Sequence, residues 1–213
     1  MGLSVVVMEG QRLTMQNDRE RSDVFHFTGE ETALDALVQA LPGASIPPPE
    51  RSNTRIAYFA SGCFWGTEYY FMKARGVTST AAGFMGGHLP NPTYQQVRGG
   101  ETGHLECVEV TYDATKTSYE DLVKLFFETH DFTQTNGQGP DIGSQYLSSI
   151  FYLDPNEKKI AETCIAFLQK QGYRVATRLT PASSFWKAEN YHQQYYEHKG
   201  EQPYCHSYKK LFR

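Results

Sequence analysis

The sequence lacks the features that mark several classes of protein. No stretch of about 18 consecutive apolar residues occurs, so no membrane-spanning helix is expected. The first residues, MGLSVVVMEGQ, carry no basic segment ahead of their short apolar stretch, so no secretory signal is expected. The formal net charge is -4 and no basic run occurs, which argues against nucleic acid as a partner.

Cysteine is scarce, and its spacing excludes two common uses. Cys63, Cys107, Cys164 and Cys205 form no C-x-x-C pair and no Cys/His cluster at zinc spacing, so no metal site is expected. Four distant cysteines in 213 residues also do not form a disulfide framework. We therefore expect a reducing compartment, the cytoplasm, in which any disulfide is catalytic.

The chain divides into three parts. Residues 1–54 are expected to be an N-terminal extension with a short helix, because Thr28 and Glu31 form a capping box ahead of apolar residues at helical spacing. A proline-rich linker follows, and the main domain is expected over residues 55–198. Residues 199–213 have no periodicity and are expected to be a flexible tail. A monomer is expected.

The order of elements in the main domain predicts one layer of helices on one sheet. Apolar and polar residues alternate, or run together as in a buried strand, in five segments. The predicted strands are 55–60, 77–87, 104–113, 146–153 and 173–181. The predicted helices are 63–74, a short turn within 91–100, 118–131, 155–172 and 187–198. We therefore predict a two-layer α/β (α+β) sandwich.

Cys63 lies in the unusual stretch GCFWG, between a predicted strand and a predicted helix. Unpaired amides and the positive end of the helix dipole favour a thiolate at such a position. Gly62 and Gly66 would allow the backbone to approach a substrate, and Phe64 and Trp65 would form a pocket wall. A small buried cysteine beside core aromatics is the alternative interpretation of the same pattern.

Glu106 shares a strand face with Val108, Val110 and Tyr112, because side chains alternate along a strand, whereas Cys107 points to the other face. If its carboxyl group is desolvated, its pKa rises and it becomes a proton donor near neutral pH. On the pattern alone, a solvated carboxylate at the end of a strand is the simpler interpretation.

The remaining candidates are uninformative when taken singly. Tyr94 and Tyr146 follow proline- or glycine-rich loops, and Asp141 is most simply a turn residue. Cys205 differs, because a thiol on a mobile tail can reach a distant site, whereas Cys164 lies among apolar residues of a predicted helix.

Five ordered blocks resemble the A-type peptide-methionine (S)-sulfoxide reductases. They are GCFWGTEYYF, GFMGGHLPNPTYQQV, TGHLECVEV, HDFTQTNGQGPDIGSQY and FWKAENYHQQYYEH, and they lie within residues 55–198. The first 54 residues have no counterpart, and the tail matches loosely. Leu105 and Leu147 depart from the family pattern, away from the catalytic positions. The resemblance implies a mixed central sheet with flanking helices.

The resemblance also implies a chemistry. Cys63 would be the nucleophile that attacks the sulfoxide sulfur, and Phe64 and Trp65 would enclose the S-methyl group of the S epimer. Glu106 would donate the proton, Tyr94 and Tyr146 would hold the sulfoxide oxygen, and Asp141 would belong to the surrounding hydrogen-bond network.

The family also implies how the enzyme is recycled. The sulfenic acid formed on Cys63 would condense with Cys205, and thioredoxin or another dithiol would reduce the disulfide. Cys107 and Cys164 remain alternative resolving thiols. The substrates would be oxidised proteins and free methionine sulfoxide, with no metal or organic cofactor.

Two other functions are compatible with parts of the sequence. A cysteine hydrolase would use Cys63 with His104 or His192 as its base. A non-catalytic peptide-binding module would use Trp65 and the tyrosines only to grip a partner.

Overall fold

The computed structural model describes residues 5–9, 12–16, 22–26 and 53–212, and the chain separates into two units, Met1–Arg51 and Ser52–Arg213. The first unit contains a three-stranded antiparallel sheet in the order β1-β2-β3, which the sequence did not predict. Its strands are β1 (Val5–Glu9), β2 (Arg12–Gln16) and β3 (Ser22–His26). The helix predicted after Thr28 and the proline-rich linker lie outside the described residues.

The second unit is built on a six-stranded mixed sheet in the order β10-β9-β4-β6-β5-β11. Its strands are β4 (Thr54–Ser61), β5 (Val77–Met85), β6 (Leu105–Asp113), β9 (Ser148–Tyr152), β10 (Arg178–Pro181) and β11 (Trp186–Lys187). Only β9 and β10 are parallel to each other, and every other neighbouring pair is antiparallel. The predicted mixed-sheet α/β sandwich is confirmed.

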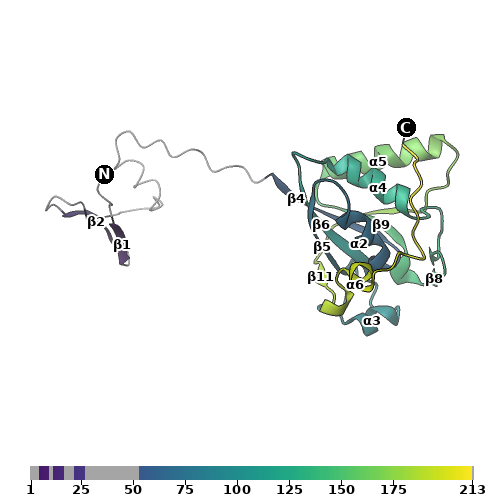
Figure 1. Cartoon of the computed structure of the whole chain (residues 1–213), viewed down its shortest axis with the longest axis horizontal. Coiled ribbons are helices and arrows are strands. Elements are labelled where there is room, and N and C mark those ends of the chain that lie inside the picture. The colour runs from purple at the N-terminus through teal and green to yellow at the C-terminus, as the bar shows by residue number, and fades with distance from the viewer. Residues whose placement is uncertain (1–4, 10–11, 17–21, 27–52, 213) are drawn as a thin grey trace. The chain divides into compact units, whose positions relative to one another are not determined.

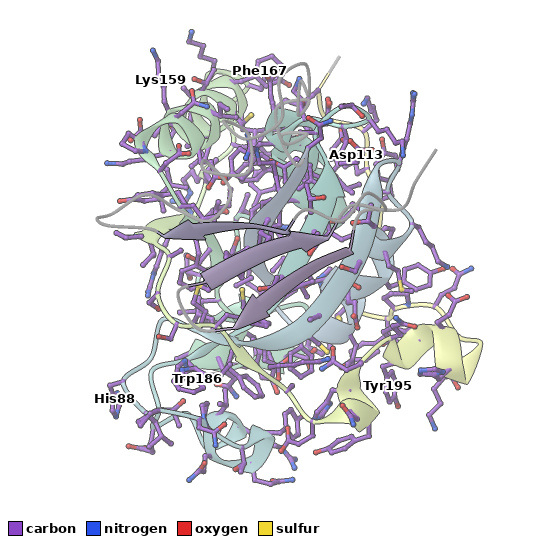
Figure 2. All side chains as sticks on the ribbon, turned by 90° about the vertical axis from the view of Figure 1, so that its left-hand side faces the viewer. His88, Asp113, Lys159, Phe167, Trp186 and Tyr195 are labelled. Atoms are coloured by element: carbon purple, nitrogen blue, oxygen red, sulfur yellow. The ribbon has the colours of Figure 1, made fainter. Side chains whose placement is uncertain are left out.

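Three helices cover one face of this sheet. They are α2 (Phe64–Met72), α4 (Tyr119–Thr129) and α5 (Pro155–Lys170), and α4 packs against both of the others (Figure 1). The shorter elements are α3 (Tyr94–Arg98), α6 (Tyr195–Lys199), the 3-10 helices η1 (Ser144–Tyr146) and η2 (Asn190–His192), and the strand pair β7 (Gly137–Gln138) and β8 (Asp141–Ile142). Lys159 and Phe167 on α5 lie at the opposite end of the domain from Trp186 and Tyr195 (Figure 2).

The alternation of side chains along β6 divides the core between the two faces of the sheet. Val108, Val110 and Tyr112 belong to the main core on the helix-covered face. Cys107 belongs to a smaller cluster on the other face, with Met85 and Phe151. The sequence predicted this division, and it places Glu106 on the same side as the helices, at the start of the strand.

Every strand and helix predicted between residues 55 and 172 is present, but the last two predictions need correction. The strand expected over 173–181 forms only at Arg178–Pro181. The helix expected over 187–198 is wrong: β11, η2 and α6 share that segment. The amide and carbonyl of Ala82 on β5 bind the side chain of Gln193, and Gln194 adopts a left-handed conformation with φ 51°. These long-range contacts override the local helix propensity.

Two absences complete the description. No helix among the described residues is long and apolar enough to cross a membrane. No cluster of three or more His, Cys, Asp and Glu side chains suited to a metal ion occurs in the described part of the chain.

Candidate active site

The site is centred on Cys63, the N-cap residue of α2, which follows β4 at the middle of the sheet. Its side chain is only 6% exposed. The backbone around it is tightly packed, because a Cβ atom on Gly62 would overlap the Gln138 side chain, and Gly62 has φ +95°. The glycine therefore admits one of the protein's own side chains rather than a substrate.

Glu106 lies beside Cys63 at the start of α2. One oxygen of its carboxyl group, Oε2, accepts a hydrogen bond of 2.9 Å from the amide of Phe64, the first residue of the helix. The side chain is 2% exposed. Burial is the main cause that raises the pKa of Glu106 to about 8; the Phe64 hydrogen bond acts against it, and the charges of Asp141 and Cys205 act with it. The carboxyl group is therefore mostly protonated at neutral pH, as the desolvated interpretation of the strand pattern requires.

The second thiol of the site is that of Cys205, which is 7% exposed and hydrogen-bonds with the thiol of Cys63. That hydrogen bond, burial and the charge of Glu106 raise the pKa of Cys63 well above its ordinary value. The helix dipole was expected to lower it. The Trp65 amide at the start of the helix does act to lower the pKa, but the hydrogen bond with Cys205 and burial outweigh it. The Phe64 amide is bound to Glu106.

The pKa of Cys205 shifts the other way, to about 6. The hydrogen bond from Cys63 is the main cause, and the neighbouring His206 contributes, while burial opposes the shift. Within the pair, the hydrogen bond from Cys63 therefore favours negative charge on Cys205. The tail residue already lies at the active site, so in this structure it has no distance to travel.

The tail from Gly200 to Phe212 has no regular secondary structure, yet several contacts hold it on the domain. The Tyr204 hydroxyl donates to both carboxylate oxygens of Asp141, at 3.1 and 3.0 Å. The Gln138 amide donates to the Cys205 carbonyl at 3.0 Å. Farther along, the amides of Leu211 and Phe212 donate to Oε1 of the buried Glu128 at 2.9 and 3.1 Å.

The aromatic residues form one connected group beside the thiols. Phe64 is almost fully buried, and its ring centroid lies 6.3 Å from that of Trp65 and 6.2 Å from that of Tyr94. Trp65 is half-buried, stacks on Tyr195 at 3.8 Å, and donates its indole N–H to Nδ1 of His192 at 3.0 Å. The indole is therefore fixed in orientation by Tyr195, which the sequence analysis did not assign to the site, and by His192, which it named only as a possible hydrolase base.

The two tyrosines expected to bind the sulfoxide oxygen lie within the electrostatic reach of Glu106 and Cys63. Burial raises the pKa of Tyr94, and the charge of Glu106 adds to this effect. The same two causes raise the pKa of Tyr146 to about 12. Both hydroxyl groups consequently keep their protons over the whole physiological pH range and remain hydrogen-bond donors.

The histidines that a cysteine hydrolase would need are engaged elsewhere. Nδ1 of His104 accepts from the Gly87 amide at 3.0 Å, and its Nε2 lies 2.8 Å from the Leu89 carbonyl. Nδ1 of His192 accepts from the Trp65 indole N–H, and its buried Nε2 has no hydrogen-bond partner among the described residues. The imidazole beside a thiol is that of His206, which adjoins Cys205 rather than Cys63.

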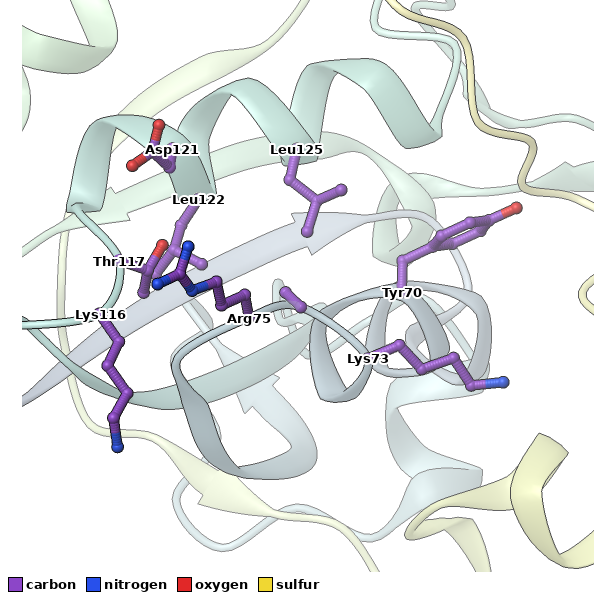
Figure 3. Close-up of a pocket in the computed structure, with 9 residues that line it drawn as sticks. Tyr70, Lys73, Arg75, Lys116, Thr117, Asp121, Leu122 and Leu125 are labelled. Carbon is purple, nitrogen blue, oxygen red and sulfur yellow. The ribbon is translucent and has the colours of Figure 1, made fainter.

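A cavity of about 500 Å³ lies between the end of α2 and the start of α4, and it is separate from this site (Figure 3). Its lining includes Lys73, Arg75, Lys116 and Leu125, and it contains none of the predicted site residues.

A buried pair of hydrogen-bonded thiols beside a protonated carboxyl group defines a thiol-dependent oxidoreductase. A family model described as peptide methionine sulfoxide reductase matches residues 55–213. The peptide methionine sulfoxide reductase MsrA of Nautilia profundicola is 46% identical over 149 residues, which cover 70% of this chain and 86% of that protein. The chain belongs to the peptide methionine sulfoxide reductase family, which confirms the resemblance seen in the sequence.

Solved structures agree with this assignment. Reduced Mxr1 from Saccharomyces cerevisiae matches with a TM-score of 0.69 and 30% identity, covering 75% of this chain and 94% of that one. Methionine sulfoxide reductase A of Corynebacterium diphtheriae matches with a TM-score of 0.63 and 39% identity, covering 73% of this chain and 79% of that one.

Proposed function

We propose that this reductase acts on the S epimer of methionine sulfoxide, free or in oxidised proteins, with Cys63 as nucleophile and Glu106 as proton donor. One observation carries the proposal: the buried Glu106 carboxyl group, with a pKa of about 8, hydrogen-bonds to the amide next to Cys63. A sulfoxide is reduced by a thiol only if its oxygen is protonated, and a carboxyl group that is protonated at neutral pH supplies that proton.

The reductase step conserves protons and electrons. The sulfur of Cys63 attacks the sulfoxide sulfur while Glu106 gives its proton to the sulfoxide oxygen. The oxygen passes to Cys63 as a hydroxyl group, and the proton that Cys63 releases restores Glu106. The substrate sulfur gains two electrons and becomes a thioether, and the Cys63 sulfur loses two and becomes a sulfenic acid.

The aromatic group would bind the S-methyl group of the substrate. Phe64 and the fixed face of Trp65 provide apolar surface, and burying one methyl group contributes about 0.8 kcal/mol. Tyr94 and Tyr146 would donate hydrogen bonds to the sulfoxide oxygen. Holding the methyl group and the oxygen at two fixed places leaves one handedness of the sulfur, which we assign to the S epimer.

Cys205 would resolve the sulfenic acid. Its thiol already hydrogen-bonds with Cys63, so an intramolecular disulfide forms without a large movement of the tail. Thioredoxin, or another cytoplasmic dithiol, would then reduce this disulfide, and no metal or organic cofactor takes part.

The test follows methionine formation from each epimer of a blocked methionine sulfoxide, with dithiothreitol and then with thioredoxin. We expect turnover of the S epimer alone. Cys205→Ser should still form one equivalent of methionine, lose turnover with thioredoxin, and recover part of it with dithiothreitol, which attacks the sulfenic acid directly. Cys107→Ser and Cys164→Ser are matched controls. Thioredoxin turnover that survives in Cys205→Ser but not in a control would move the resolving role to that cysteine.

A further inference from the structure

The residue after the resolving thiol, His206, is buried against the start of α2. It is 5% exposed, and its Nδ1 lies 3.1 Å from Sγ of Cys205. A Cβ atom on Gly66 would overlap the imidazole ring. The second glycine of the GCFWG stretch therefore leaves the space in which this histidine meets the thiol.

A chain of hydroxyl groups contacts the other ring nitrogen. Nε2 of His206 lies 3.4 Å from the Ser61 hydroxyl, which lies 2.7 Å from the Thr67 hydroxyl. Thr67 in turn donates to the carbonyl of Cys63 at 3.3 Å. The Thr67 hydroxyl also lies 3.5 Å from Nε2. With Thr67 donating to the Cys63 carbonyl, we infer that its oxygen accepts from Ser61 and that the Ser61 oxygen accepts from Nε2–H.

We infer the tautomer of His206 from this direction. With its proton on Nε2, a neutral His206 presents the lone pair of Nδ1 to the Cys205 thiol. When Nδ1 also takes up a proton, the hydroxyl chain still accepts from Nε2 without rearrangement. Only the proton between Nδ1 and Sγ has to move.

We propose that His206 is the base that takes the proton of Cys205 and so prepares it to attack the sulfenic acid. The inference rests on the resolving role proposed for Cys205. The Cys205 thiolate attacks the sulfur of Cys63, an S–S bond forms, and the S–OH bond breaks. The departing hydroxide combines with the proton held on His206 to give water. Cys205 is oxidised, the sulfenic sulfur is reduced, and no further reactant is required.

The electrostatics around Cys205 are consistent with this role. Its pKa is lowered first by the hydrogen bond from Cys63 and then, against burial, by the hydrogen bond and charge of His206, while Asp141 acts in the opposite sense. Glu106, Tyr196 and Tyr204 also interact with its charge, and His130 interacts with His206. An imidazole beside a cysteine is an established means of forming a thiolate at neutral pH.

The test measures the resolving step by itself. Full-length wild type and His206→Asn are mixed, without reductant, with the S epimer of a blocked methionine sulfoxide in a single turnover between pH 6 and 9. Alkylation and mass mapping of quenched samples give the amounts of methionine, sulfenic acid and Cys63–Cys205 disulfide over time. The rate constant for conversion of the sulfenic acid to the disulfide follows from these amounts and is independent of how fast methionine forms. Asparagine retains a polar group near the position of Nδ1 but cannot hold the proton. His88→Asn, at an exposed histidine, is the matched control.

In wild type and His88→Asn, this rate constant should change less than about threefold from pH 6.5 to 9, because His206 holds the proton of Cys205. In His206→Asn it should be at least about tenfold slower at pH 6.5 and within about threefold of wild type at pH 9. Once Cys63 is a sulfenic acid, its thiol no longer donates to Cys205, and an unassisted cysteine ionises near pH 8.5. Ser61→Ala removes the acceptor of Nε2–H and should shift the profile in the same direction by less. It provides the same test if His206→Asn does not fold.

Two failures are distinguishable. A normal Cys63–Cys205 disulfide with a wild-type pH profile in His206→Asn and in Ser61→Ala would overturn the role of His206 and leave that of Cys205 intact. A disulfide from Cys63 to Cys107 or Cys164 would instead overturn the resolving role of Cys205, and the role of His206 with it.

Discussion

Replacement of Glu106 by glutamine tests the proton donor with little change of shape. The amide oxygen of glutamine can still accept the hydrogen bond that Glu106 receives from Phe64 at 2.9 Å. The buried side chain keeps its volume but loses the transferable proton. The substitution therefore separates proton donation from the packing of α2 on β6.

The size of the effect follows from the pKa. At pH 7 a carboxyl group with a pKa of about 8 is protonated in about nine molecules out of ten, so wild type works close to its maximum rate. A positioned proton donor contributes about 10²–10⁴-fold, and we expect Glu106→Gln to slow methionine formation by about 10² or more. In wild type the rate should fall about tenfold per pH unit above pH 8 as Glu106 loses its proton, whereas the variant should not show this fall.

The assay is the single-turnover rate of methionine formation between pH 6 and 10. Glu109→Gln is the matched control, because Glu109 lies on the same strand and accepts the Tyr58 hydroxyl on the other face of the sheet. A Glu106→Gln rate within about threefold of wild type across neutral pH would show that the proton comes from another group.

The same substitution has a consequence for stability. Because the folded pKa of Glu106 is raised, its contribution to stability is present below the unfolded pKa and is lost as the pH rises towards 8. The free energy of unfolding of Glu106→Gln, relative to wild type, should therefore increase between about pH 4.5 and 8, by a few kcal/mol at about 1.4 kcal/mol per pKa unit. A difference that does not change with pH would contradict burial as the cause of the raised pKa.

Three further substitutions address the nucleophile, the methyl site and the tail. Cys63→Ser should abolish methionine formation while its circular dichroism stays that of wild type; residual S-epimer turnover would remove Cys63 from its role. Trp65→Leu should lower kcat/KM about tenfold, mainly through KM, because the stacked indole is lost; an unchanged KM would place the methyl site elsewhere. Glu128→Ala leaves the amides of Leu211 and Phe212 without their acceptor and should slow turnover with thioredoxin more than with dithiothreitol; equal effects on both would separate tail anchoring from resolution.

Most of the second unit could be predicted because its signals are local. Alternation along β6 placed Val108 and Val110 on one face and Cys107 on the other, as the core clusters show. The helix predicted over 155–172 also forms, as α5, with Pro155 in its first turn. In such segments the periodicity of apolar residues along one strand or helix is enough to predict its secondary structure and its buried face.

The secondary structure of the segment after residue 185 could not be predicted, because it depends on contacts with residues far away in the sequence. The side chain of Gln193 binds the backbone of Ala82, which lies 111 positions earlier, and Trp186 pairs with Phe84. No pattern within the segment itself contains this information. The local pattern therefore predicted a helix where a short strand and two short helices form.

The site shows the same division between local and distant signals. The sequence pointed to Cys63 by its place before a helix and to Glu106 by its strand face. It gave no reason to connect Trp65 with His192, 127 positions away, or Ser61 with His206, 145 positions away. The only indication of a role for His206 in the sequence was its position next to a tail cysteine. The role becomes apparent only in the structure, where both residues lie beside Cys63.

The two glycines around Cys63 illustrate why a motif can point to the right place for the wrong reason. Both were taken as room for a substrate, yet the space beside Gly62 is filled by Gln138 and the space beside Gly66 by His206. Gln138 also holds the carbonyl of the resolving cysteine, and His206 contacts its sulfur. The two glycines therefore leave space for the segments that hold the Cys205 thiol beside Cys63. A substitution at either glycine should slow the recycling of the enzyme as well as sulfoxide reduction.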